Sequence, residues 1–265
     1  MNTVYSKDST VIAYDVYGEG PSLIYITGAS CHRTFEPIVE DVRILSRVFK
    51  VYSYDRRGRG NSGNNETYTI KKEIEDIESI IDISGEPTFL FGHSSGAVLA
   101  LEAALHLGQK VKKIAIYDAP YVSDLNEQLE YMKLEIQIRN LISKKMYSKA
   151  IKVFLAKIGM PRLFTLMLPL FPGWKEIKAL APTLLYDIEL TKVFPPLEKL
   201  SRIEIPTLIL TGQKSPNTIK VVADQMSQVI RNCSFEIVKD QNHLVDTKVI
   251  MPFLINHFND VKSIN

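Results

Sequence analysis

Short apolar runs alternate with helix-length stretches along most of this chain, and this alternation constrains the fold more than any other feature. Each of the first four runs is followed by a glycine or an aspartate, which is typical of a buried parallel strand that ends in a turn. Strands joined by helices predict an α/β fold with a doubly wound, mostly parallel sheet and right-handed crossovers. The first four runs cover residues 22–27, 50–54, 88–91 and 113–117.

The same pattern returns near the end of the chain. Residues 206–212 and 234–238 read as two more strands, and residues 217–230 and 249–258 as the helices that follow them. Among the earlier helices, residues 69–83 give the strongest signal, because isoleucines recur there at helical spacing and Gly85 stands just past the end as a stop signal.

The alternation breaks in the middle of the chain. Residues 121–202 carry helical patterns and no strand signal, which predicts a helical cap inserted after the strand that ends at Asp118. The core would then consist of residues 1–120 and 203–265. Lys157 and several prolines interrupt the apolar part of this segment, so it is too short to cross a bilayer. A lid that touches a lipid surface stays open as an alternative to a cap packed over a pocket.

Charge and cysteine content exclude several functional classes. The formal net charge is +2 and the basic residues are scattered, which argues against a nucleic-acid partner. Cys31 and Cys233 lie too far apart in sequence to form a disulfide framework or a metal cluster. No secretory signal, phosphate loop or dinucleotide fingerprint is visible. We therefore expect a cytoplasmic protein that acts on a small molecule without a cofactor or a metal, and the oligomeric state stays open.

Residues 92–96 carry the strongest chemical signal. Gly92-His93-Ser94-Ser95-Gly96 has the form G-x-S-x-G and lies between an apolar run and an Ala/Leu-rich helix. A tight strand-to-helix turn would project the Ser94 hydroxyl from the sheet in a strained conformation, and glycines would leave room for the close approach. The N–H of Ser95 would lie at a helix N-terminus, where it could stabilise an oxyanion.

Three motifs together make the sequence resemble the cap-bearing α/β-hydrolases over nearly its whole length. They are the turn around Ser94, Gly28-Ala29 after an early strand, and Asp55-Arg56-Arg57-Gly58-Arg59-Gly60-Asn61-Ser62 after the next. The resemblance implies a serine hydrolase with an oxyanion hole formed by the N–H groups of Ala29 and Ser95. It also implies that residues 55–62 are structural.

The base is expected among five histidines. His243 follows the last predicted strand, where the family has its catalytic histidine, so we predict that His243 activates Ser94. His32 follows the Gly28-Ala29 turn closely and could line the substrate pocket with Gly28. His93 should point away from the serine.

The acid is the point at which this chain departs from the family pattern. The family usually has an aspartate three residues after the glycine that ends the next-to-last strand, but this chain has Ser215 there. Asp118 ends another strand at the same edge of the sheet, so it could reach His243 instead. We predict that Asp118 is the acid and that Ser215→Ala is nearly silent. A merely structural Asp118, capping the entry to the insertion, is the alternative.

The predicted function is hydrolysis of a small, apolar carboxylic ester through an acyl-enzyme on Ser94. Lactone, thioester, amide and carbon–carbon hydrolysis stay open, because all of these reactions pass through an oxyanion. A ligand-binding or signalling protein with weak turnover is the alternative from another class, and Ser215 keeps it open. Large apolar residues of the cap are candidates for the pocket wall, namely Phe154, Phe164 and Trp174.

Overall fold

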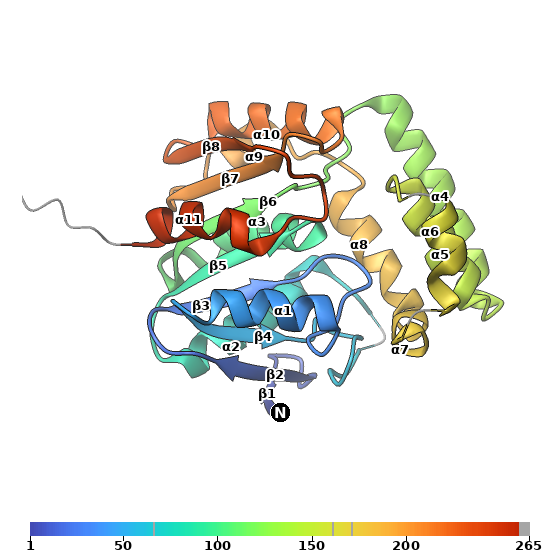
Figure 1. Cartoon of the computed structure of the whole chain (residues 1–265), viewed down its shortest axis with the longest axis horizontal. Coiled ribbons are helices and arrows are strands. Elements are labelled where there is room, and N and C mark those ends of the chain that lie inside the picture. The colour runs from blue at the N-terminus through green and yellow to red at the C-terminus, as the bar shows by residue number, and fades with distance from the viewer. Residues whose placement is uncertain (66, 161, 171, 260–265) are drawn as a thin grey trace, which may run out of the picture.

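The computed structural model describes residues 1–65, 67–160, 162–170 and 172–259. Eight strands form one sheet in the order β1-β2-β4-β3-β5-β6-β7-β8 (Figure 1). The strands are β1 (Asn2–Tyr5), β2 (Val11–Tyr17), β3 (Ser22–Ile26), β4 (Lys50–Tyr54), β5 (Thr88–His93), β6 (Val111–Tyr117), β7 (Thr207–Gly212) and β8 (Cys233–Val238).

The sheet is parallel from β4 through β8, whereas β1 and β2 are antiparallel to their neighbours. The predicted mostly parallel α/β sheet is therefore confirmed. The strand β1 was not predicted. Its four residues, Asn-Thr-Val-Tyr, have no fully buried position, so neither an apolar run nor a clean alternation marks them.

Helices cover both faces of the sheet. The sheet has an apolar cluster on each face, and neighbouring residues of one strand point to opposite faces. Leu23 belongs to one cluster and Ile24 to the other. The helices α1 (Glu36–Leu45) and α11 (Thr247–Phe258) pack on the Leu23 face, in front of the sheet in Figure 1. The opposite face is covered by α2 (Ile70–Ser84), α3 (Ser95–Leu107) and α10 (Asn217–Val229).

The ends of α2 follow the signals in the sequence. Thr69 caps the helix, and its side chain accepts a hydrogen bond from the N–H of Lys72. Gly85 follows the last helical residue with φ of +78°, a left-handed conformation that costs glycine little. A helix was expected over residues 69–83, and the structure confirms it within one residue at each end.

A helical insertion separates β6 from β7, as expected. Its apolar core is distinct from the two clusters of the sheet and contains Ile138, Ile151, Phe154 and Leu184. The insertion stands at one end of the sheet in Figure 1. Among the described residues, no helix is long and apolar enough to cross a membrane. Its helices are α4 (Leu125–Ser143), α5 (Tyr147–Lys157), α6 (Arg162–Met167), α7 (Trp174–Ala179), α8 (Leu184–Thr191) and α9 (Leu197–Leu200).

Candidate active site

Ser94 occupies the sharp turn between β5 and α3. Its φ of 57° and ψ of −127° are strained for a residue with a side chain, as the motif predicts. The turn packs so tightly that a Cβ on Gly96 would lie 2.1 Å from the carbonyl oxygen of Ile26. A Cβ on Gly92 would lie 2.3 Å from the carbonyl oxygen of Gly96. Only glycine fits at these two positions.

The loop after β8 brings His243 to Ser94. The Nε2 atom of His243 lies 3.1 Å from the Ser94 hydroxyl oxygen, although the two residues are 149 positions apart. Two hydrogen bonds hold this loop by its backbone. The Tyr117 hydroxyl donates to the carbonyl of Asn242 at 2.7 Å, and Nε2 of His93 donates to the carbonyl of His243 at 2.8 Å.

His93 therefore supports the loop that carries His243. Burial, followed by the nearby His243, lowers the pKa of His93 to about 4. His93 is thus neutral at physiological pH, and its bond to a carbonyl fixes the proton on Nε2. The sequence predicts only that His93 points away from the serine. The contact with the His243 carbonyl could not be predicted, because nothing in the sequence shows which loop passes beside β5.

Asp118 lies at the end of β6, fully buried, with φ of 51°. Its Oδ2 atom lies 3.0 Å from Nδ1 of His243, and its Oδ1 accepts a hydrogen bond from the N–H of Gly212 at 3.2 Å. The Ser215 hydroxyl donates to the same Oδ2 at 2.6 Å. The residue at the family's usual acid position thus contacts the carboxylate that reaches His243 from β6.

The residues that carry the two candidate oxyanion donors lie in the same cavity wall as Ser94. Ala29 and Ser95 line one cavity together with Ser94 and His243. Within the described ranges, the N–H groups of Ala29 and Ser95 donate to no other protein atom. Both donors are therefore free to bind an oxygen in that cavity.

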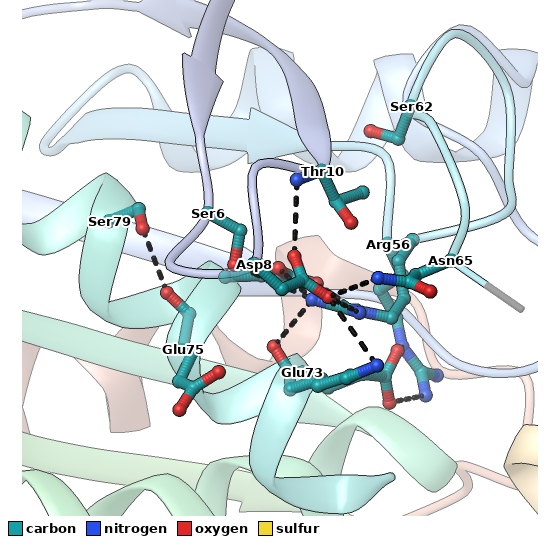
Figure 2. A network of polar contacts seen from close by, with 12 residues as sticks. Ser6, Asp8, Thr10, Arg56, Ser62, Asn65, Glu73, Glu75 and Ser79 are labelled. Atoms are coloured by element: carbon teal, nitrogen blue, oxygen red, sulfur yellow. Dashed lines mark hydrogen bonds and ion pairs between the residues drawn. The ribbon is translucent and has the colours of Figure 1, made fainter. Parts of the chain in front are cut away.

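Three buried arginines hold the loop after β4. Arg57 forms a two-pronged pair with Asp76 at 2.6 and 2.8 Å, and its Nη1 lies 2.9 Å from Asp8. Figure 2 shows the guanidinium of Arg56 facing Glu73, and the closest of these contacts is 2.6 Å. Arg56 and Arg59 both reach Asp187 of α8, in the insertion. These contacts agree with a structural role for residues 55–62.

The cavity beside Ser94 has a volume of about 310 Å³. The insertion contributes much of its wall, and Phe154 belongs to it as expected. Residues that the sequence analysis did not single out also line it. They include Tyr121, Val122, Glu127, Tyr131, Lys157, Ile158, Asp187, Thr191, Thr218 and Ile219.

Other expected pocket residues lie elsewhere. His32 is buried outside the cavity, because its Nδ1 pairs with the Thr34 hydroxyl at 3.0 Å and its ring lies against Phe35. Trp174 packs against the apolar core of the insertion and does not line the cavity. Gly28 is not a wall residue either, although a Cβ on it would lie 2.9 Å from Cβ of Ser94. The side chain of Phe164 lies outside the described part of the chain.

This arrangement is suited to acyl transfer. A hydroxyl, an imidazole and a buried carboxylate stand in one hydrogen-bonded line, and Ala29 and Ser95, which carry the two candidate oxyanion donors, line the same cavity. Such a line allows an alcohol to lose its proton as it attacks a carbonyl. Among the described residues, no group of three or more His, Cys, Asp or Glu side chains could hold a metal ion.

Comparisons with known proteins extend over nearly the whole chain. The family described as "Alpha/beta hydrolase family" matches residues 23–248. The structure of an alpha/beta hydrolase from Sphaerobacter thermophilus DSM 20745 has a TM-score of 0.87 and 32% identity, and the match covers 97% of this chain and 100% of that one.

Two further similar proteins are named by their activities. An (E)-2-((N-methylformamido)methylene)succinate hydrolase from Acinetobacter baylyi is 22% identical over 261 residues, which cover 92% of this chain and 91% of that protein. The structure of a thermophilic esterase from Thermogutta terrifontis has a TM-score of 0.70 at 18% identity, covering 97% of this chain and 99% of that one. At 22% and 18% identity, the similarity to these two proteins shows a common fold and does not show a common substrate.

Proposed function

The chain belongs to the alpha/beta hydrolase family, and on this premise we propose that it cleaves a small, apolar carboxylic ester through an acyl-enzyme on Ser94. The observation that carries the proposal is the line of three side chains: Ser94 Oγ lies 3.1 Å from His243 Nε2, and His243 Nδ1 lies 3.0 Å from Asp118 Oδ2. Within this proposal Ser94, His243 and Asp118 are the catalytic residues.

Each group has one role in the proposed reaction. The imidazole of His243 takes the hydroxyl proton of Ser94 as the serine oxygen attacks the ester carbonyl. Asp118 keeps the other ring proton on Nδ1 and stabilises the imidazolium that forms. The N–H groups of Ala29 and Ser95 bind the oxyanion.

The second half of the reaction uses the same groups. The imidazolium gives its proton to the departing alcohol, which leaves an acyl group on Ser94. His243 then takes a proton from water, whose oxygen attacks the acyl carbonyl, and the carboxylic acid is released. Serine and imidazole return to their first protonation states.

The cavity wall supports a small substrate with an apolar part. A volume of about 310 Å³ holds a short acyl group together with an alcohol, and Phe154, Ile158 and Ile219 offer apolar surface. The similar proteins named above include an esterase and a succinate-derivative hydrolase, so other acyl bonds are the next candidates after the ester.

The test combines an active-site probe with a kinetic screen. A fluorophosphonate should label the protein rapidly and stoichiometrically on Ser94, and p-nitrophenyl esters of short acids should be hydrolysed. Ser94→Ala should abolish both signals. Labelling without ester hydrolysis would show that Ser94 is reactive but that the substrate is not an ester. Lactones, thioesters and amides would then be screened. Absence of labelling in the folded wild-type protein would contradict the proposal and favour a ligand-binding protein.

A further inference from the structure

We propose that Asp187, which the helical insertion contributes through α8, is a positioning residue for both oxyanion donors and acts through Arg59 and through Ser95. The inference rests on the proposed function, because it assigns a role to groups around the same site. It also gives the insertion a part in the chemistry beyond forming the wall of the cavity.

The first link runs from Asp187 to the Gly28–Ala29 peptide. Nη2 of Arg59 donates to both carboxylate oxygens of Asp187 at 2.8 Å, and Nη1 of Arg59 donates to the carbonyl of Gly28 at 2.7 Å. In a trans peptide the C=O and the following N–H point in opposite directions. Holding the Gly28 carbonyl on the arginine therefore aims the Ala29 N–H away from the arginine, toward the cavity that Ala29 lines with Ser94.

The second link runs from Asp187 to the first residue of α3. The Ser95 hydroxyl donates to Oδ1 of Asp187 at 2.7 Å and accepts a hydrogen bond from Nη1 of Arg56 at 3.2 Å. The same arginine nitrogen lies 3.3 Å from the carbonyl of Thr27. One carboxylate thus holds the residue that supplies the second donor, and Arg56 joins that residue to the loop that supplies the first.

Burial makes these links strong. The side chains of Arg56, Arg59 and Asp187 are each no more than 1% exposed. Burial raises the pKa of Asp187, but Arg59 and Arg56 outweigh it and hold this pKa below its ordinary value, so the carboxylate is ionised. With Glu73 beside Arg56, two positive and two negative groups balance within the cluster. Charged hydrogen bonds of this kind fix geometry more firmly than neutral ones.

A positioning role and a purely electrostatic role of Asp187 predict opposite changes in the rate of attack by Ser94. Removing the charge of Asp187 leaves a net positive cluster beside the oxyanion. If only the electric field mattered, this change would speed attack by Ser94. If Asp187 positions the donors, the change slows attack, because loss of one oxyanion donor typically costs a factor of about 10² to 10³.

The experiment measures fluorophosphonate labelling of Ser94 over a range of probe concentrations, which separates the affinity for the probe from the limiting rate of attack. In Asp187→Asn, which keeps the shape of the side chain, the limiting rate should fall at least about tenfold while the affinity for the probe stays within about twofold. Arg59→Lys keeps the positive charge and loses the forked geometry of the guanidinium. It should likewise lower the limiting rate and leave the affinity for the probe unchanged.

Asp76→Asn is the matched control. Asp76 pairs with Arg57, a neighbour of Arg56 in the same loop, and is as buried as Asp187, but within the described residues it makes no hydrogen bond to the Gly28–Ala29 turn or to Ser95. Breaking this pair should lower the melting temperature, as in Asp187→Asn, and leave the limiting rate within about twofold of the wild type.

Three results would overturn the inference: an unchanged or faster limiting rate in Asp187→Asn, an unchanged rate in Arg59→Lys, or an equal loss in Asp76→Asn. If Asp187→Asn does not fold, Arg59→Lys and Ser95→Ala test the inference instead. In both variants the limiting rate should fall while the affinity for the probe is kept. Failure of the wild-type protein to label is a different outcome, since it contradicts the proposed function itself.

Discussion

At the scale of single residues, Asp118 receives two hydrogen bonds on one oxygen, from Ser215 and from Nδ1 of His243. Asp118→Asn keeps the size of the side chain but removes its charge and lets the imidazole adopt the wrong tautomer. In a comparable triad this change costs about 10⁴ in kcat. We expect a loss of that order in ester hydrolysis, measured with enzyme whose circular dichroism matches the wild type. A loss below about tenfold would leave Asp118 with a structural role only.

The structure predicts a larger loss of activity for Ser215→Ala than the sequence does. From the sequence we expected Ser215→Ala to be almost silent, but its hydroxyl lies 2.6 Å from the carboxylate that faces His243. A hydrogen bond to a charged group contributes about 1.5–3 kcal/mol, which corresponds to about 10- to 150-fold in rate. Because this hydrogen bond is present before the attack as well as during it, we expect Ser215→Ala to lower kcat by the lower end of this range, about tenfold. Because the effect passes through Asp118, Ser215→Ala should add little to Asp118→Asn. Fully multiplicative losses in the double variant would show that the two residues act independently.

His93 predicts how stability depends on pH. Its pKa of about 4 in the folded protein lies below the ordinary value of 6.5, so the unfolded chain binds more protons between these values. The contribution of His93 is therefore present above pH 6.5 and is lost as the pH falls toward 4, by about 2 kcal/mol at pH 5.

The comparison that isolates His93 uses His93→Gln, which can still donate to the His243 carbonyl but does not titrate. Urea unfolding at pH 7.5 and pH 5 should give a smaller loss of unfolding free energy in this variant than in the wild type. Titrating groups that do not interact with His93 are common to both proteins and cancel in the difference. Equal losses in the two proteins would show that His93 does not control the acid sensitivity.

At the scale of helices and strands, local patterns predicted most of the fold. The bounds of β4 agree with the expected ones, and those of α2 agree within one residue at each end, because an apolar run and a helix that ends at a glycine are local signals. The shared carboxyl edge of parallel strands predicted that Asp118 could reach His243. The pairing of His243 with Ser94 was implied by the resemblance to the family. The structure brings the three side chains together at this edge.

Contacts that depend on packing between elements could not be predicted in this way. Asp187 lies on an otherwise largely apolar helix, and a buried charge requires a partner, but nothing local identifies Arg56 and Arg59 as those partners. For His32, closeness in sequence was a misleading signal. Its closeness to Ala29 in sequence predicted a pocket residue, whereas the turn after Ala29 directs its ring toward Phe35 and Thr34.

At the scale of the whole molecule, the cavity lies where the insertion meets the carboxyl edge of the sheet. Ala29, Ser94 and His243 line it from the sheet, and Phe154 lines it from α5. Phe154 also belongs to the apolar core of the insertion, so one side chain serves both the stability of the insertion and the size of the cavity. These two effects can be separated by experiment.

Phe154→Ala should shift the preference of the enzyme toward longer acyl groups. Removing the ring enlarges the cavity of about 310 Å³, so acyl chains that the wild type excludes should gain in kcat/KM relative to acetate. The measurement is kcat/KM for p-nitrophenyl esters from acetate to dodecanoate. The variant should also lose about 3–5 kcal/mol of unfolding free energy, because truncating a buried phenylalanine removes apolar contacts and leaves a void.

Ile151→Ala separates pocket size from stability. Ile151 lies on the same helix, one turn before Phe154, and is fully buried in the same core, but it does not line the cavity. Its truncation should cost about 2–5 kcal/mol of unfolding free energy and leave the acyl-length profile unchanged. If both variants shift the profile equally, a loosened insertion controls selectivity. If neither shifts it, the acyl group does not contact Phe154.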